Sequence, residues 1–318
     1  MTEHFVHPDV RAHLDGLKAN PRPKLTVEML PAVRPKMGEI YAALDPPIGE
    51  LAVTRDILMP GPGGQIPLRL FDVRESRSPG PVAVFFHGGG FIIGNNDSAA
   101  FLCAEIARQL DVPVISVDYR LAPEHVWPAA PDDAEAAARW IADNGAAFNL
   151  DITSLVLCGD SAGGNLAIVT SLALRDRPAT VPVALQFAIY PVIEFSFDTE
   201  SAKAFGEGYG LDEVDRRWLD DLYKPQLGHW RATPIVADQT GMPPTVILTA
   251  GLDPLRDEGR AYADKTAAAG VPTAYIEARG TIHAFASLRR KLPSGQADVL
   301  AALLKAKEML RDSLAARL

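Results

Sequence analysis

Gly159-Asp160-Ser161-Ala162-Gly163, which follows the apolar run Leu155-Val156-Leu157-Cys158, is the stretch of sequence that decides the fold. The apolar run predicts a buried strand, and residues 165–175 predict a helix soon after it. A serine flanked by glycines at such a strand-to-helix turn is typical of a nucleophile elbow, because glycines remove Cβ atoms where the backbone turns tightly. Ser161 is therefore a candidate nucleophile. A serine-glycine loop that only caps a helix is the alternative.

Apolar runs and amphipathic segments alternate through most of the chain. We predict strands over residues 52–59, 66–73, 82–86, 112–117, 154–158, 183–190, 245–249 and 273–277. We predict helices over residues 98–110, 131–144, 165–175, 255–269 and 296–316. The Gly61-Pro62-Gly63-Gly64 turn predicts that the first two strands form a hairpin. This alternation predicts an α/β fold, in which helices flank a mostly parallel central sheet on both faces.

Two segments depart from this rhythm. Residues 1–48 are interrupted by prolines and predict short helices joined by kinks. Residues 191–240, which follow the sixth predicted strand, form an aromatic and acidic insertion. We favour a lid for the insertion, because it leaves the carboxyl end of a strand, where ligands bind in open α/β sheets. A self-packed helical excursion is the alternative. Residues 49–190 and 241–318 are predicted to form one α/β domain.

Composition limits the classes of partner. The 318 residues carry 31 basic and 40 acidic side chains, for a net charge of −9. This balance disfavours a surface for nucleic acid or anionic membranes and fits a neutral or weakly charged substrate better. No stretch reaches the roughly 18 apolar residues that span a bilayer, and the first residues lack a secretory signal pattern, so we expect a cytoplasmic protein. Cys103 and Cys158 are predicted to be reduced core thiols rather than a disulfide or metal ligands.

A serine hydroxyl needs a base within hydrogen-bond reach and an acid that orients the base. Among the seven histidines, His283 follows the last predicted strand through a short loop. This loop lies at the carboxyl ends of the strands, where Ser161 would also lie. Asp253 follows the seventh predicted strand, and the chain order Ser, Asp, His is one of the known orders of a catalytic triad. Asp257 and Glu258 are alternative acids, and Asp253 before a proline also fits an ordinary helix N-cap.

The run His87-Gly88-Gly89-Gly90-Phe91 directly follows the third predicted strand. Consecutive glycines let backbone N–H groups converge on one point without intervening side chains, as an oxyanion hole requires. A phosphate-binding loop is also rich in glycine, but this run lacks the G-K-[ST] ending and the later spacing of a dinucleotide motif. The run therefore predicts an oxyanion hole.

Together these motifs resemble those of the hormone-sensitive lipase family of α/β-hydrolase esterases, specifically the bacterial carboxylesterases. The resemblance covers about residues 50–318 and rests on His87 to Phe91, Asp118 to His125, Gly159 to Asn165, Asp253 to Gly259, and His283. It implies an α/β-hydrolase fold. It also implies that Ser161, Asp253 and His283 form the triad.

The family pattern implies further roles around the triad. The amides of Gly89, Gly90 and Ala162 would form the oxyanion hole, and His87 and Gly88 would support that loop. We expect Phe91 at the substrate pocket. Residues 1–48 and 191–240 would jointly form a helical cap.

Two positions depart from the family pattern without removing a reacting group. Ala284 follows the histidine where the family usually has glycine, and Glu194 stands where an aspartate is common. The resemblance implies a serine carboxylesterase for small, uncharged, short-acyl esters, with no cofactor or metal. An amidase or acyltransferase is the alternative, and a non-catalytic receptor of the same fold is disfavoured by His283. The last strand, 273–277, is expected at the sheet edge, where it could pair with a second subunit in a homodimer.

Overall fold

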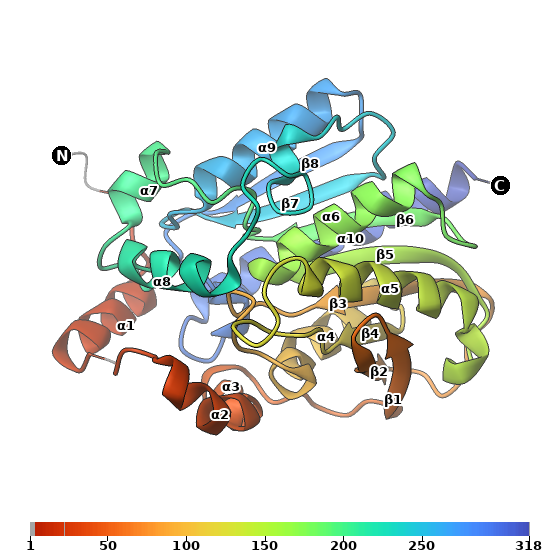
Figure 1. The fold of residues 1–318 in the computed structure, drawn as a ribbon, viewed down its shortest axis with the longest axis horizontal. Coiled ribbons are helices and arrows are strands. Elements are labelled where there is room, and N and C mark those ends of the chain that lie inside the picture. Colours follow the sequence, from red (N-terminus) through yellow and green to blue (C-terminus); the bar gives the residue numbers. More distant parts are fainter. Residues whose placement is uncertain (1–3, 22, 318) are drawn as a thin grey trace.

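One eight-stranded sheet forms the centre of the computed structural model, which describes residues 4–21 and 23–317 (Figure 1). The strands are β1 (Val53–Gly61), β2 (Gly64–Asp72), β3 (Gly80–Phe86), β4 (Val114–Val117), β5 (Ile152–Asp160), β6 (Val183–Ile189), β7 (Thr245–Ala250) and β8 (Thr273–Ala278). Their order is β1-β2-β4-β3-β5-β6-β7-β8. Strand β2 is antiparallel to β1 and β4, and the remaining pairs are parallel. The predicted α/β fold and the hairpin between β1 and β2 are confirmed.

Helices cover both faces of the sheet (Figure 1). They are α1 (Pro8–Ala19), α2 (Leu30–Val33), α3 (Met37–Leu44), α4 (Asn96–Leu110), α5 (Ala129–Asp143), α6 (Ala162–Asp176), α7 (Glu200–Phe205), α8 (Glu213–Tyr223), α9 (Arg256–Ala268) and α10 (Ser294–Ala315). In β5, Val156 and Cys158 pack on the side of α4 and α10, whereas Leu155 and Leu157 pack on the side of α5 and α6. Burial on both faces explains why residues 155–158 of β5 form an apolar run without polar residues.

Helix α6 begins at Ala162, three residues before the predicted start at 165. Its first turn holds Gly163 and Gly164, which are poor helix formers. Packing requires the first of them, because a Cβ at Gly163 would lie 1.8 Å from the carbonyl oxygen of Phe86 at the end of β3. The helix therefore starts directly after Ser161 and lies close against the sheet.

The N-terminal helices and the insertion meet at one end of the molecule, where Figure 1 shows α1, α7 and α8 together. The ring of His4 packs edge-on against Phe205 of α7, with centroids 4.9 Å apart. The backbone N–H of His7 donates to the carbonyl of Gly280, in the loop after β8, at 3.2 Å. These contacts place both segments beside the carboxyl ends of the parallel strands.

Both cysteines are buried and free, as predicted. Burial raises the pKa of the Cys103 thiol and of the Cys158 thiol. Within residues 4–21 and 23–317, no helix is both long enough and apolar enough to cross a bilayer.

Candidate active site

Ser161 lies between the end of β5 and the start of α6, as the motif predicts. Its φ is 55° and its ψ is −118°, a conformation that costs energy for any residue with a Cβ. Surrounding contacts hold the turn: the N–H of Ser161 donates to the carbonyl of Ile189 in β6 at 2.8 Å, and the carbonyl of Ser161 accepts from Val192 at 3.2 Å. The strained turn holds the hydroxyl at the carboxyl edge of the sheet.

His283 connects Ser161 to Asp253. Its Nε2 lies 2.9 Å from the Oγ of Ser161, and its Nδ1 lies 2.7 Å from Oδ2 of Asp253. The Asp253 side chain has no solvent exposure, and its Oδ1 accepts from the N–H of Leu255 at 2.9 Å. The carboxylate thus favours the tautomer with a proton on Nδ1, which leaves the Nε2 lone pair facing the serine.

The two alternative acids point elsewhere. Oδ2 of Asp257 accepts from the N–H of Ser201 in the insertion, at 2.8 Å. Oε2 of Glu258 accepts from the N–H of Glu194 at 2.9 Å, and burial raises the pKa of this carboxyl. Of the three candidate carboxyls, Asp253 is the one that contacts His283.

The glycine run forms the loop between β3 and α4. The N–H of Gly88 donates to Oδ1 of Asp160 at 2.7 Å, next to Ser161 in sequence. Burial raises the pKa of the Asp160 carboxyl, and this hydrogen bond opposes the shift. The amides of Gly89 and Gly90 have no hydrogen-bond acceptor among the described residues. Ala162 is the first residue of α6, so its amide has no acceptor inside the helix.

His87 contacts this loop and the neighbouring Tyr119. Its Nδ1 is 2.8 Å from the carbonyl oxygen of Gly88, and its ring stacks on that of Tyr119 with centroids 4.4 Å apart. The hydroxyl of Tyr119 donates to the carbonyl of His87 at 2.7 Å. His87 therefore packs between the glycine loop and Tyr119.

Helix α8 of the insertion lies directly on the glycine loop. A Cβ added at Gly90 would lie 2.7 Å from a methyl carbon of Leu219. The ring of Phe91 stacks face to face on that of Tyr223, with centroids 3.8 Å apart, and both side chains are almost fully buried. Neither Leu219 nor Tyr223 belongs to a sequence motif that predicts a site, although Tyr223 is one of the aromatic residues of the insertion. The aromatic content of the insertion was the available signal, but it did not indicate which face of α8 turns inward.

Ala284 has a positive φ of 64°. A left-handed backbone favours glycine, which gives a physical reason for the glycine that the family usually places after the histidine. The two contacts of His283 are formed with alanine at this position. The departure noted in the sequence therefore coincides with local backbone strain.

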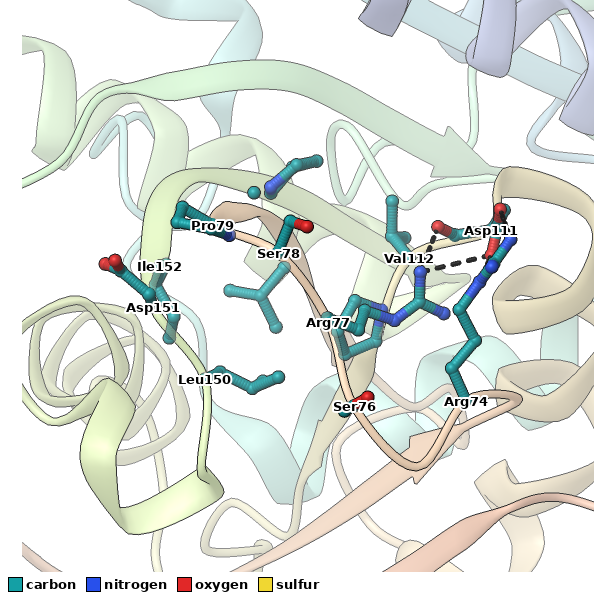
Figure 2. A pocket seen from close by; sticks show the side chains of 14 residues that line it. Arg74, Ser76, Arg77, Ser78, Pro79, Asp111, Val112, Leu150, Asp151 and Ile152 are labelled. Atoms are coloured by element: carbon teal, nitrogen blue, oxygen red, sulfur yellow. Dashed lines mark hydrogen bonds and ion pairs between the residues drawn. The ribbon is translucent and has the colours of Figure 1, made fainter.

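A separate cavity of about 370 Å³ lies far from Ser161 (Figure 2). Figure 2 shows Arg74 and Arg77 directed toward Asp111, which accepts from Arg74 Nε at 2.9 Å and pairs with Arg77 Nη1 at 3.1 Å. The cavity is lined by the first residues of β3 and β5, whereas Ser161 follows the last residue of β5. The cavity therefore lies at the opposite end of the strands from the candidate site.

The described residues contain no group of three or more His, Cys, Asp or Glu side chains that could hold a metal ion.

Comparisons with known proteins identify the family of the chain. A family model for the alpha/beta hydrolase fold matches residues 83–287. The carboxylic ester hydrolase LipN of Mycobacterium tuberculosis is 37% identical over 267 residues, which cover 81% of this chain and 70% of that protein. An arylesterase of Saccharolobus solfataricus is 34% identical over 265 residues, which cover 80% of this chain and 83% of that protein.

A solved structure is similar to this chain over nearly its whole length. The crystal structure of an alpha/beta hydrolase enzyme from the metagenome of Lake Arreo, Spain, superimposes with a TM-score of 0.87 at 37% identity. The match covers 96% of this chain and 98% of that one. The chain therefore belongs to the hormone-sensitive lipase family of α/β-hydrolase carboxylic ester hydrolases.

Proposed function

We propose that this ester hydrolase cleaves small, uncharged carboxylic esters through an acyl-enzyme on Ser161. The observation that carries the proposal is the position of His283, which lies 2.9 Å from Ser161 Oγ and 2.7 Å from Asp253 Oδ2. Both contacts fall within the hydrogen-bond range that proton transfer needs.

The reaction proceeds in two halves. Ser161 Oγ attacks the ester carbonyl carbon while His283 Nε2 takes its proton, and the amides of Gly89, Gly90 and Ala162 stabilise the oxyanion. His283 then gives the proton to the leaving alcohol, and the acyl group stays on Ser161. Water, deprotonated by His283, attacks the acyl-enzyme, which releases the carboxylic acid and restores the serine. Asp253 stabilises the imidazolium without accepting its proton.

We further propose that residues 1–48 and 191–240 form a cap that limits the size of the acyl group. Support comes from α8, whose Leu219 side chain lies against Gly90 and whose Tyr223 ring covers Phe91. With these side chains beside the proposed oxyanion amides, a short acyl chain fits better than a long one. Phe91 then acts mainly through its stacking on Tyr223, which holds α8 against the loop.

The nucleophile assignment is tested with Ser161→Ala and a short-chain aryl ester. We expect the variant to lose turnover of the ester while its unfolding curve stays close to that of the wild type. Mass spectrometry of wild type treated with an aryl phosphonate should find the adduct on Ser161. Equal turnover by the variant would reject the assignment.

A substrate panel separates the alternatives of the same class. Esters, anilides and acceptor alcohols are compared under one set of conditions, and we expect ester hydrolysis to dominate. Faster cleavage of anilides would indicate an amidase, and products that carry the acceptor alcohol would indicate an acyltransferase. Ligand binding without any turnover would indicate a receptor.

We also propose that β8 can pair with a second copy of the chain. It is the last strand in the sheet order, so one of its edges has no strand partner in the sheet. Light scattering should then give about twice the mass of 34.2 kDa. A monomer mass at all concentrations tested would reject this dimer.

A further inference from the structure

Arg34, in the N-terminal segment, contacts the loop that carries the proposed oxyanion amides. Its Nε donates to the carbonyl of Ile92 at 2.8 Å, and its Nη2 donates to the carbonyl of Ala122 at 2.6 Å. The carboxylate of Glu124 accepts from Nη1 and Nη2, both at 2.9 Å. One guanidinium thus joins the N-terminal segment, the glycine loop and the loop after β4.

The glycine loop needs restraint from outside, because its backbone is unusual. Gly89, Gly90 and Phe91 have φ values of 116°, 62° and 61°. A non-glycine residue such as Phe91 keeps a positive φ only where the surrounding structure over-determines it. The carbonyl of Phe91 accepts from the N–H of Ala122 at 2.9 Å, and the next carbonyl, that of Ile92, accepts from Arg34. Arg34 therefore binds a carbonyl on each side of the hydrogen bond between Ala122 and Phe91, namely those of Ile92 and Ala122.

The main chain of Arg34 secures the downstream end of the same loop. Its carbonyl accepts from the side-chain amide of Asn95 at 3.0 Å. Asn95 in turn caps α4 through a reciprocal pair of hydrogen bonds with Ser98. At the upstream end, Gly88 is held by Asp160. The amides of Gly89 and Gly90 lie between these two anchors.

We propose that Arg34 is a positioning residue for the oxyanion hole. By fixing the carbonyls of Ile92 and Ala122, it keeps the amides of Gly89 and Gly90 in the orientation that binds the oxyanion. The inference rests on the proposed function, since it requires that those amides act on the reacting carbonyl. The loss should fall on kcat rather than on KM, because these donors bind the transition state more strongly than the ground state.

The test compares Arg34→Met with a matched control, Arg69→Met. Arg69 has almost the same side-chain exposure, 22% against 21%, and also forms an ion pair with a carboxylate, but its partners are Asp56 and Asp97. Sites are counted by titration with an aryl phosphonate, so that any unfolded fraction does not enter kcat. A trifluoromethyl ketone serves as the transition-state analogue.

We expect Arg34→Met to lower kcat per titrated site about tenfold, with KM nearly unchanged, and to weaken binding of the ketone by a similar factor. Arg69→Met should change neither quantity. Arg34→Lys keeps the charge but lacks the planar fork, so its kcat should fall between those of Arg34→Met and the wild type. This second variant decides the question if the methionine variant does not fold.

The inference is overturned if the Arg34 variants and Arg69→Met agree in kcat and in ketone binding within about twofold. A role in stability alone would lower the melting temperature without changing kcat per titrated site. Ser161→Ala is assayed in parallel. Activity in that variant would reject the proposed nucleophile, whereas an inactive Ser161→Ala with fully active Arg34 variants would reject only the role of Arg34.

Discussion

Arg289 and Asp45 form a two-point ion pair inside the protein, although 244 positions separate them in the chain. Nη2 of Arg289 lies 2.7 Å from Oδ2 of Asp45, and Nε donates to Oδ1 at 2.8 Å. The two side chains are 2% and 0% exposed. Asp45 follows α3, and Arg289 lies in the loop after His283, so the pair ties the N-terminal segment to the loop of the proposed base.

Asp45→Asn should lower the free energy of unfolding by about 3 kcal/mol, because it leaves the buried charge of Arg289 without its main partner. Glu105, whose Oε2 lies 3.2 Å from Nη1 of Arg289, remains as a second partner of the guanidinium. The loss should therefore fall at the lower end of the range for a broken buried ion pair. Urea unfolding measures the change. Asp56→Asn, which breaks an ion pair with an exposed carboxylate, should cost less than about 1 kcal/mol. Equal losses in the two variants would contradict the prediction.

Asp220 in α8 should make the protein less stable as pH rises. Burial raises the pKa of its carboxyl to about 7, against the opposing charge of Arg216. In the unfolded chain an aspartate ionises near ~3.9, so between about pH 4 and pH 7 the unfolded state loses a proton that the folded state keeps. The free energy of unfolding then falls with pH across this window.

Asp220→Asn should remove this fall in the free energy of unfolding with pH. We expect the variant to be about 1 to 2 kcal/mol more stable than the wild type at pH 8, and the gain to vanish near pH 4. Urea unfolding at both pH values gives the comparison. The exposed neighbour Asp221 supplies the control, since Asp221→Asn should show no such difference between the two pH values. A gain that is independent of pH would argue against a raised pKa at Asp220.

Ala284→Gly should stabilise the protein by about 0.5 to 1 kcal/mol, because the left-handed backbone at this position strains a residue with a Cβ. Turnover should stay unchanged, since His283 already makes both of its contacts. Thermal and urea unfolding measure the effect. Ala269 has an ordinary φ of −79°, so Ala269→Gly should instead lose stability. Destabilisation by both substitutions would refute the strain argument.

Leu219→Ala should extend the range of esters that the enzyme accepts. The change removes side-chain atoms that lie against Gly90, which opens space beside the proposed oxyanion amides. One added methylene in a hydrophobic pocket is worth about 1 to 3 kcal/mol, so kcat/KM for butyrate to hexanoate esters should rise about tenfold relative to acetate esters. Leu227 is 67% exposed, and Leu227→Ala is the control. An unchanged chain-length profile would place the acyl pocket elsewhere.

The pH profile of kcat/KM tests the proposed base. Only neutral imidazole can accept the proton of Ser161, so kcat/KM should be lower at about pH 5 than at about pH 8, because acid protonates the base. The measurement uses an aryl ester whose own hydrolysis is subtracted at each pH. A flat profile over this range would speak against His283 as the base.

The sequence alone was sufficient to predict the α/β fold and the succession of strands and helices along residues 49–190 and 241–318. This worked because strand and helix periodicities, the hairpin turn and the glycine-flanked serine are local patterns, each carried by a few neighbouring residues. Parallel strands also end at one edge of a sheet, so the sequence predicted that the loops with Ser161, Asp253 and His283 would lie near one another. Most element bounds differ from the predicted ones by one to three residues, and α6 starts earlier than predicted because close packing against Phe86 selects Gly163 despite its low helix propensity.

Tertiary structure decided which side chains meet. The sequence favoured Asp253 as the acid by its place at a strand end but left Asp257 and Glu258 as alternatives, and the contacts in the structure separate the three. Arg34 with Ile92 and Asp45 with Arg289 bridge 58 and 244 positions. No local pattern encodes such pairs, because they depend on how separate elements pack. The sequence determined the candidate reacting groups and the scaffold, and long-range packing determined the contacts that hold the glycine loop and the loop of His283.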